Sequence, residues 1–185
     1  MKREAIGIFI DGDYFDGILR NEFDSQRIDF FTFSQLIIPE NAQRFRTYYY
    51  KSIPYLNVES SPDERLRNEG VEKFLQSLRH LPRFKVRTGE LTKTMDGQFK
   101  RKGINVSMSI DVTRLSGERV VDQIYMVCSD PDLLPLIKAA RDMGTIVRIY
   151  HGENIPERML AECDEAVRID EDLINRSLRE NHLNE

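Results

Sequence analysis

Two short apolar runs, at residues 5–10 and 124–127, each lead within a few positions into an Asp-x-Asp turn. Continuous apolar runs of this length are typical of strands in a parallel sheet, which are buried on both faces. Apolar positions at helical spacing follow both turns. The pattern therefore predicts the same local unit twice: a buried strand, an acidic turn and a helix.

The second of these units continues into another strand. After the helix comes Gly144, a residue suited to ending helices because it tolerates positive φ, and residues 145–150 are rich in β-branched side chains. Residues 121–151 thus predict a strand–helix–strand unit. Open α/β sheets bind ligands at the carboxyl ends of their strands, where both acidic turns would lie.

The rest of the chain alternates in the same way, with one hairpin. Further strands are predicted at residues 45–53, 84–91 and 166–169, with hairpin arms at 86–92 and 99–102 about the Asp-Gly of 95–98. Further helices are predicted at residues 33–38, 107–115 and 170–183. Another runs from the capping box at 61–64 to about residue 80, and a short one starts at residues 151–156 and ends at about residue 163. Tyr48, Tyr49 and Tyr50 would alternate between core and surface. The pattern predicts a three-layer α/β/α sandwich with a mostly parallel central sheet.

Composition narrows the class of protein. A chain of 185 residues, 40% hydrophobic and 31% charged, fits one soluble globular domain. Its formal charge of -4 gives no overall positive field, which disfavours a passive nucleic-acid binder but allows an enzyme with a local basic patch. Cys128 and Cys163 form no zinc or disulfide pattern. With neither a signal peptide nor a membrane-length apolar run, we expect a cytoplasmic protein.

The two acidic turns carry the candidate chemistry. Asp11, Asp13, Asp130 and Asp132 follow strands whose carboxyl ends share one edge, and they would converge if those strands are neighbours. Such a cluster repels itself unless a cation neutralises it, and hard oxygen ligands suit Mg²⁺ or Mn²⁺. The alternative is that each Asp caps a helix, Asp13 capping the first. For either acidic turn alone, helix capping is the favoured interpretation. For the two turns together, a metal centre is favoured.

Other polar residues are harder to interpret. Lys100, Arg101 and Lys102 form a charge run, which is usually a solvated face but could equally contact phosphate. Asn105 starts the next helix, and whether Asp111 turns back to the strand ends depends on the tilt of that helix. Histidines are scattered along the chain, so catalysis by histidine has little support.

Three blocks resemble the NYN domains, the LabA-like branch of the PIN-like nuclease superfamily. They are residues 8–14 (Ile-Phe-Ile-Asp-Gly-Asp-Tyr), residues 102–106 (Lys-Gly-Ile-Asn-Val) with Asp111, and residues 128–137 (Cys-Ser-Asp-Pro-Asp-Leu-Leu-Pro-Leu-Ile). Four positions depart from the family's pattern, among them Ser129 and Pro131, which stand where the family has Gly and Ser. Asn105 stands where the family usually has Asp, and Asp13 where it usually has Asn, an exchange that conserves formal charge.

The resemblance implies one PIN-like (Rossmann-like) domain over residues 1–185, with 170–185 a helical tail, and a metal-dependent ribonuclease that cleaves RNA. By position, it implies a catalytic set of Asp11, Asp111, Asp130 and Asp132. The same residues with Asp13 and Asn105 would hold Mg²⁺ or Mn²⁺, and Lys102, Arg101 and Lys100 would face the phosphates. A weakened module that binds RNA or a protein without cleavage remains the alternative. Phosphoryl chemistry on DNA or a nucleotide, and a homodimer, also stay open.

Overall fold

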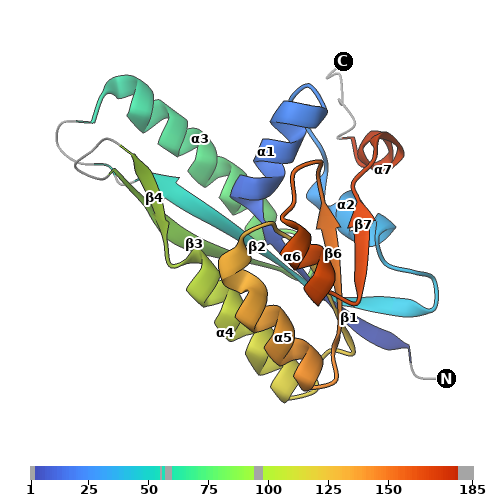
Figure 1. The fold of residues 1–185 in the computed structure, drawn as a ribbon. Coiled ribbons are helices and arrows are strands. Elements are labelled where there is room, and N and C mark those ends of the chain that lie inside the picture. The colour runs from blue at the N-terminus through green and yellow to red at the C-terminus, as the bar shows by residue number, and fades with distance from the viewer. Residues whose placement is uncertain (1–2, 55, 57–59, 94–97, 179–185) are drawn as a thin grey trace.

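A seven-stranded sheet forms the centre of the molecule, in the order β4-β3-β2-β1-β5-β6-β7 (Figure 1). The computed structural model describes residues 3–54, 56, 60–93 and 98–178. The strands are β1 (Glu4–Asp11), β2 (Ala42–Pro54), β3 (Phe84–Lys93), β4 (Phe99–Lys102), β5 (Gln123–Val127), β6 (Ile146–His151) and β7 (Glu165–Arg168). Neighbouring strands are parallel except β4, which runs antiparallel to β3. The predicted mostly parallel sheet is confirmed.

Helices cover both faces of this sheet and bury a separate core on each. The helices are α1 (Gly12–Glu22), α2 (Phe30–Leu36), α3 (Pro62–Arg79), α4 (Ile104–Gly117), a short 3-10 turn η1 (Pro131–Leu133), α5 (Leu134–Asp142), α6 (Glu157–Glu162) and α7 (Glu171–Arg176). One core packs α1, α2, α3 and α7 against the sheet, and the other packs α4, α5 and α6. These layers make an α/β/α sandwich consistent with a PIN-like fold (Figure 1).

Several predicted element boundaries were wrong, among them the starts of β2 and α4, which both begin three residues earlier than expected, and the hairpin was right in its arms. Side-chain capping by Asp29 starts α2 earlier than expected, at Phe30. The last helix ends at Arg176, and Leu178 beyond it pairs with Ile28 in an isolated bridge, whereas residues 179–183 of the expected helix lie outside the described part of the chain. The hairpin arms pair as expected, whereas residues 94–97 of its turn lie outside the described part of the chain.

The expected alternation of the three tyrosines between core and surface is also wrong. Tyr48, Tyr49 and Tyr50 are all fully buried, because β2 lies inside the sheet and both of its faces are covered. Tyr49 belongs to the α1 side, while Tyr48 and Tyr50 belong to the α4 side. Tyr48 stacks on Phe9 of the neighbouring strand, with ring centroids 4.9 Å apart.

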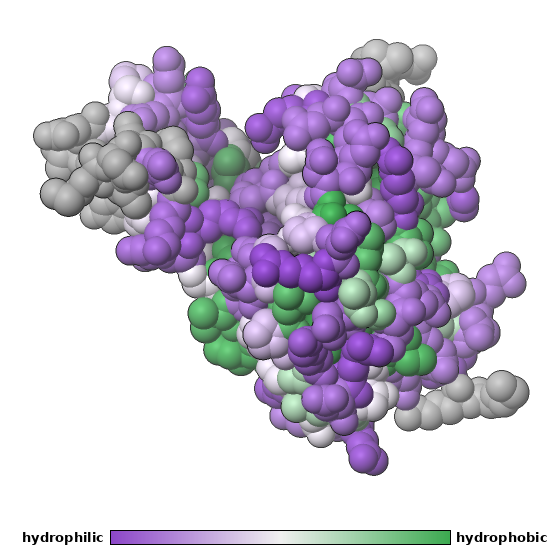
Figure 2. Space-filling model, viewed as in Figure 1, coloured by the Kyte–Doolittle hydropathy of each residue, from purple (hydrophilic) through white to green (hydrophobic). Residues whose placement is uncertain are grey.

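The face of the molecule drawn in Figure 2 is largely hydrophilic. Figure 2 shows polar residues over most of one face, with apolar residues visible over α4, where Val106 and Ile110 are 63% and 60% exposed. Across the residues that the structure describes, no helix has the length and apolar character needed to cross a membrane.

Candidate acidic site

The two acidic turns meet at one edge of the sheet. Strands β1 and β5 are parallel neighbours, and Ile10 pairs with Val127 at their carboxyl ends. The turns at residues 11–13 and 130–132 therefore leave the sheet side by side, as the sequence pattern predicts.

Asp11 is held by the backbone of the helix it precedes. Its Oδ1 accepts hydrogen bonds from the N–H groups of Asp13 at 3.1 Å and Tyr14 at 3.2 Å, so Asp11, and not Asp13 as expected, caps α1. Gly12 is needed because a Cβ there would lie 2.5 Å from the Tyr49 ring. Asp11 is only 1% exposed, and this burial raises its pKa, an effect that the charge of Arg101 offsets only in part.

Asp130 plays the same part in the second turn. Its Oδ1 accepts the N–H of Asp132 at 2.9 Å and so caps η1, with Pro131 at the first position of that turn. The capping alternative is therefore correct for Asp11 and Asp130. It does not exclude a functional role, because both carboxylates also bind other side chains.

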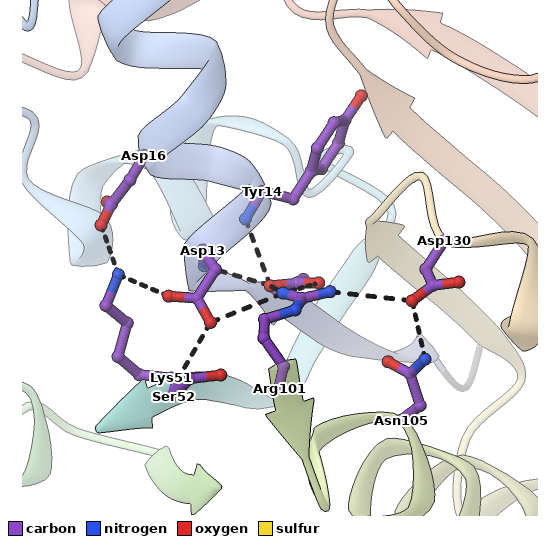
Figure 3. A network of polar contacts seen from close by, with 9 residues as sticks. Asp13, Tyr14, Asp16, Lys51, Ser52, Arg101, Asn105 and Asp130 are labelled. Carbon is purple, nitrogen blue, oxygen red and sulfur yellow. Dashed lines mark hydrogen bonds and ion pairs between the residues drawn. The ribbon is translucent and has the colours of Figure 1, made fainter. Parts of the chain in front are cut away.

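A guanidinium lies where the carboxylates converge. Arg101 of β4 places Nη1 2.9 Å from both carboxylate oxygens of Asp11 and 3.5 Å from Oδ2 of Asp13, and its Nη2 is 3.7 Å from Oδ2 of Asp130. Figure 3 shows this side chain reaching from β4 into the middle of the network. Arg101 was expected to face phosphates, yet it neutralises the acidic cluster.

Asp13 has a second cation, which the sequence pattern did not reveal. Nζ of Lys51, at the end of β2, lies 2.8 Å from Asp13 Oδ1 and 2.6 Å from Asp16 Oδ2 (Figure 3). The backbone N–H of Ser52 donates to Asp13 Oδ2 at 3.1 Å. Burial would raise the pKa of Asp13, but Lys51 and Ser52 outweigh it, and the pKa lies below its ordinary value. The only signal in the sequence was a lysine near the carboxyl end of the strand predicted at residues 45–53.

Asn105 also belongs to this network. Gly103, with φ of 85°, turns the chain from β4 into α4, and Asn105 follows in the first turn of that helix. Its side-chain amide donates to Asp130 Oδ2 at 2.8 Å. The residue that departs from the family's usual Asp thus contributes a donor, which stabilises the Asp130 carboxylate without adding charge.

Asp111 binds a different set of side chains. Its carboxylate accepts two hydrogen bonds from Arg87, at 3.0 and 2.8 Å, and one from the Tyr50 hydroxyl at 2.9 Å. Burial would raise the pKa of Asp111, but these bonds and the charge of Arg87 hold it below its ordinary value. The tilt of α4 directs Asp111 toward β2 and β3, and its contacts include no residue of the acidic cluster.

The remaining predicted residues are exposed. Lys100, Lys102 and Asp132 lie at the surface, and within the described ranges the structure shows no ion pair for any of them. Their side chains are therefore available to a ligand.

The site as arranged does not fit a metal ion. The donor chemistry is suitable, because carboxylate oxygens converge on one positive charge. That position is held by Arg101, however, and the part of the chain that the structure describes contains no group of three or more His, Cys, Asp or Glu side chains placed to hold an ion. A metal could enter only after Arg101 moves.

The family comparison matches most of the chain. The family described as NYN domain matches residues 5–170. A search of curated proteins finds no match. Among solved structures, MurG of Acinetobacter baumannii superposes with a TM-score of 0.44 at 11% identity, over 89% of this chain and 41% of that one. The chain thus spans less than half of that protein, and a likeness this weak carries no argument.

Proposed function

The chain belongs to the NYN domain family, a family of PIN-like nucleases, and we propose that it hydrolyses phosphodiester bonds of RNA at the acidic site. The family supports a nuclease-type activity. The RNA substrate, the catalytic residues and the metal are our proposal.

One observation supports this function above the others. Carboxylates from the ends of two neighbouring strands, Asp11 and Asp130, converge with Asp13 on a single positive charge. If these carboxylates served only to cap helices, they would contact the backbone N–H groups that they cap and would not also share a cation. Carboxylates that converge on one point are the ligands with which phosphoryl chemistry holds a divalent ion, and that ion offsets the charge of the phosphodiester.

The residues of the chain have distinct parts in this proposal. Asp11 is fixed by its capping bonds, whereas Asp130 has a side chain 26% exposed that a substrate can reach. Asp132 lies exposed beside it and completes the acidic set. Asp111, bound to Arg87, has a positioning role. Lys100 and Lys102, exposed on β4 with Arg101, would contact backbone phosphates.

PIN-like nucleases generally depend on a divalent metal, and we propose Mg²⁺ or Mn²⁺ here. Such an ion supplies activated water and charge stabilisation when it is bound. Because Arg101 bridges the carboxylates in the described arrangement, the residues present would have to rearrange before they could hold it.

The test is cleavage of a labelled single-stranded RNA by purified protein with Mn²⁺. Cleavage should stop on addition of EDTA and in Asp130→Asn. The matched control is Asp142→Asn, at the exposed far end of α5, which should cleave like the wild type. Cleavage that survives both EDTA and Asp130→Asn would refute the proposal. A panel with DNA and nucleotides separates the other phosphoryl substrates.

A second function is favoured by one specific observation. Arg101 and the Asn105 amide together satisfy Asp11 and Asp130 without a metal, as expected of a module that binds RNA and no longer cleaves it. For such a module, RNA binding would persist in EDTA, and no cleavage would appear with any divalent ion.

A further inference from the structure

We propose that Arg101 is a resident cation that closes the acidic site to metal, and that RNA phosphate draws it out and so admits the ion. This proposal rests on the proposed function, since it takes RNA as the ligand. It adds an order of events: RNA binds first and the metal second.

The charges explain why Arg101 and a metal exclude each other. The guanidinium contacts Asp11 at 2.9 Å through both carboxylate oxygens and reaches Asp130 at 3.7 Å. A divalent ion on the same oxygens would lie within a few ångströms of the guanidinium, where like charges repel strongly in a partly buried site. Lys51 is no substitute, because its contacts are with Asp13 and Asp16.

The position of Arg101 allows it to leave. It lies on β4, a short strand at the edge of the sheet that pairs with β3 alone, Arg101 opposite Leu91. Its side chain is 30% exposed, so a phosphate can reach the guanidinium without unfolding the protein. Lys100 and Lys102 are exposed on the same strand, but their side chains alternate to the face opposite Arg101, so Arg101 itself must meet the phosphate.

Phosphate is the ligand best suited to compete for this side chain. A guanidinium binds a phosphate through two parallel hydrogen bonds, much as it binds a carboxylate. Transfer of Arg101 to phosphate leaves Asp11 and Asp130 without a cation, whereas Asp13 keeps Lys51, and the freed carboxylates then favour a divalent ion. Because coupling is reciprocal, RNA must tighten metal binding by the same factor as metal tightens RNA binding.

The experiment measures Mn²⁺ binding by calorimetry, without RNA, in the wild type and in Arg101→Gln. Arg101→Gln should bind Mn²⁺ about tenfold more tightly or better. Arg101→Lys keeps the charge but loses the paired donors, so its affinity for Mn²⁺ should lie between those of the wild type and Arg101→Gln. Arg176→Gln, which removes an exposed arginine of α7, should match the wild type. Asp130→Asn in the Arg101→Gln background should abolish binding.

A second measurement tests the role of RNA. A nuclease-resistant 2′-O-methyl RNA should tighten Mn²⁺ binding to the wild type and leave Arg101→Gln unchanged. Equal Mn²⁺ affinity in the wild type, Arg101→Gln and Arg101→Lys would overturn the proposal, as would equal tightening by RNA in all three. If Arg101→Gln does not fold, Arg101→Lys carries both comparisons. Neither measurement needs cleavage. If the protein binds RNA first and Mn²⁺ second but never cuts RNA, the proposed nuclease activity is refuted and the proposed order of binding is not.

We infer independently that a basic cluster on the α4 side of β2 and β3 binds RNA phosphates outside the acidic site. The cluster consists of Arg46, Lys85, Arg87 and Arg114. Tyr48 pairs with Lys85 and Tyr50 pairs with Arg87, so the two cations share the face of the sheet that these tyrosines occupy. Arg46 precedes Tyr48 by two positions and lies on that face too.

The cluster carries excess positive charge on a chain whose formal charge is -4. Arg87 is paired with Asp111, and Arg114 with Glu118 at 3.2 Å. Within the described ranges Arg46 and Lys85 form no ion pair, although the charge of Asp111 acts on Lys85, and both cations lie over aromatic rings. Partial burial, followed by the charges of Arg87, Arg46 and Arg114, lowers the pKa of Lys85, as expected for cations this close together. A polyanion would relieve this repulsion.

The test is the salt dependence of RNA binding in EDTA, so that cleavage plays no part. In the double variant Arg46→Gln, Lys85→Gln, the affinity for a single-stranded RNA should fall. The slope of log affinity against log salt concentration should become shallower by about 1.4, because two phosphate contacts are lost. Lys73→Gln with Arg79→Gln, on α3 of the opposite face, is the charge-matched control. An affinity and a slope equal to those of this control would overturn the inference.

Discussion

Asn105 donates its side-chain amide to Oδ2 of Asp130 at 2.8 Å, and this contact joins the start of α4 to the turn after β5. Asn105→Asp would replace the donor with a second carboxylate. Without metal, we expect the free energy of unfolding at neutral pH to fall by about 1–2 kcal/mol, from the lost bond and the new repulsion. Urea titrations with and without Mn²⁺ measure this. Mn²⁺ should restore more stability to the variant than to the wild type, and equal restoration would contradict the expectation.

Lys51 offsets the charge that Asp13 adds to the site. Lys51→Met removes a side chain only 13% exposed and leaves Asp13 without its nearest cation, so we expect a loss of about 2–3 kcal/mol in the free energy of unfolding. Asp13→Asn in the same background should cost less than it does alone, because the repulsive charge is gone. A double-mutant cycle by urea denaturation gives the coupling, and strictly additive losses would show that the pair is not coupled.

Asp111 should make stability depend on pH in the acidic range. Its folded pKa lies below the unfolded value, so the ionised carboxylate stabilises the fold above about pH 4. That contribution is lost as the pH falls through the lowered folded pKa. Asp111→Asn should therefore be less stable by about 1–2 kcal/mol at neutral pH and should approach the wild type near pH 2. Thermal unfolding followed across this range would show parallel curves if Asp111 contributed nothing.

Gly89 keeps β4 close to β3. A Cβ at this position would lie 2.4 Å from the backbone oxygen of Lys102, so Gly89→Ala must push β4 outward. We expect a loss of about 1–3 kcal/mol in the free energy of unfolding. Gly17→Ala is the control, because a Cβ there meets nothing within 4 Å in the interior of α1, and it should be neutral or stabilising. A similar result for both variants would exclude the close approach as the cause.

The sheet and one edge of the site could be predicted because they depend on local patterns. Apolar runs followed by acidic turns identify β1 and β5, and parallel strands place their carboxyl ends together. Asp11 and Asp130 were found in this way. The metal and the chemistry assigned to them remain predictions.

The partners of those aspartates could not be predicted, because they depend on register and tilt. Three consecutive residues, Lys100, Arg101 and Lys102, are all basic and cannot be told apart by their sequence pattern. Only the pairing of Arg101 with Leu91 decides which of their side chains enters the acidic site. Whether Asp111 reaches the cluster depends on how α4 lies against β2 and β3. Neither relationship leaves a periodic signal in the sequence.

The distance along the chain between the members of the site has a consequence for folding. Arg101 and Asp11 are 90 residues apart, and Asn105 and Asp130 are 25 apart. Contacts of long sequence separation form late, since the entropy of closing the intervening loops must first be overcome. Because β4 is a short strand at the sheet edge, a refolding molecule can bury both cores before Arg101 docks. We therefore expect burial of the cores and completion of the acidic site to be separable steps of refolding.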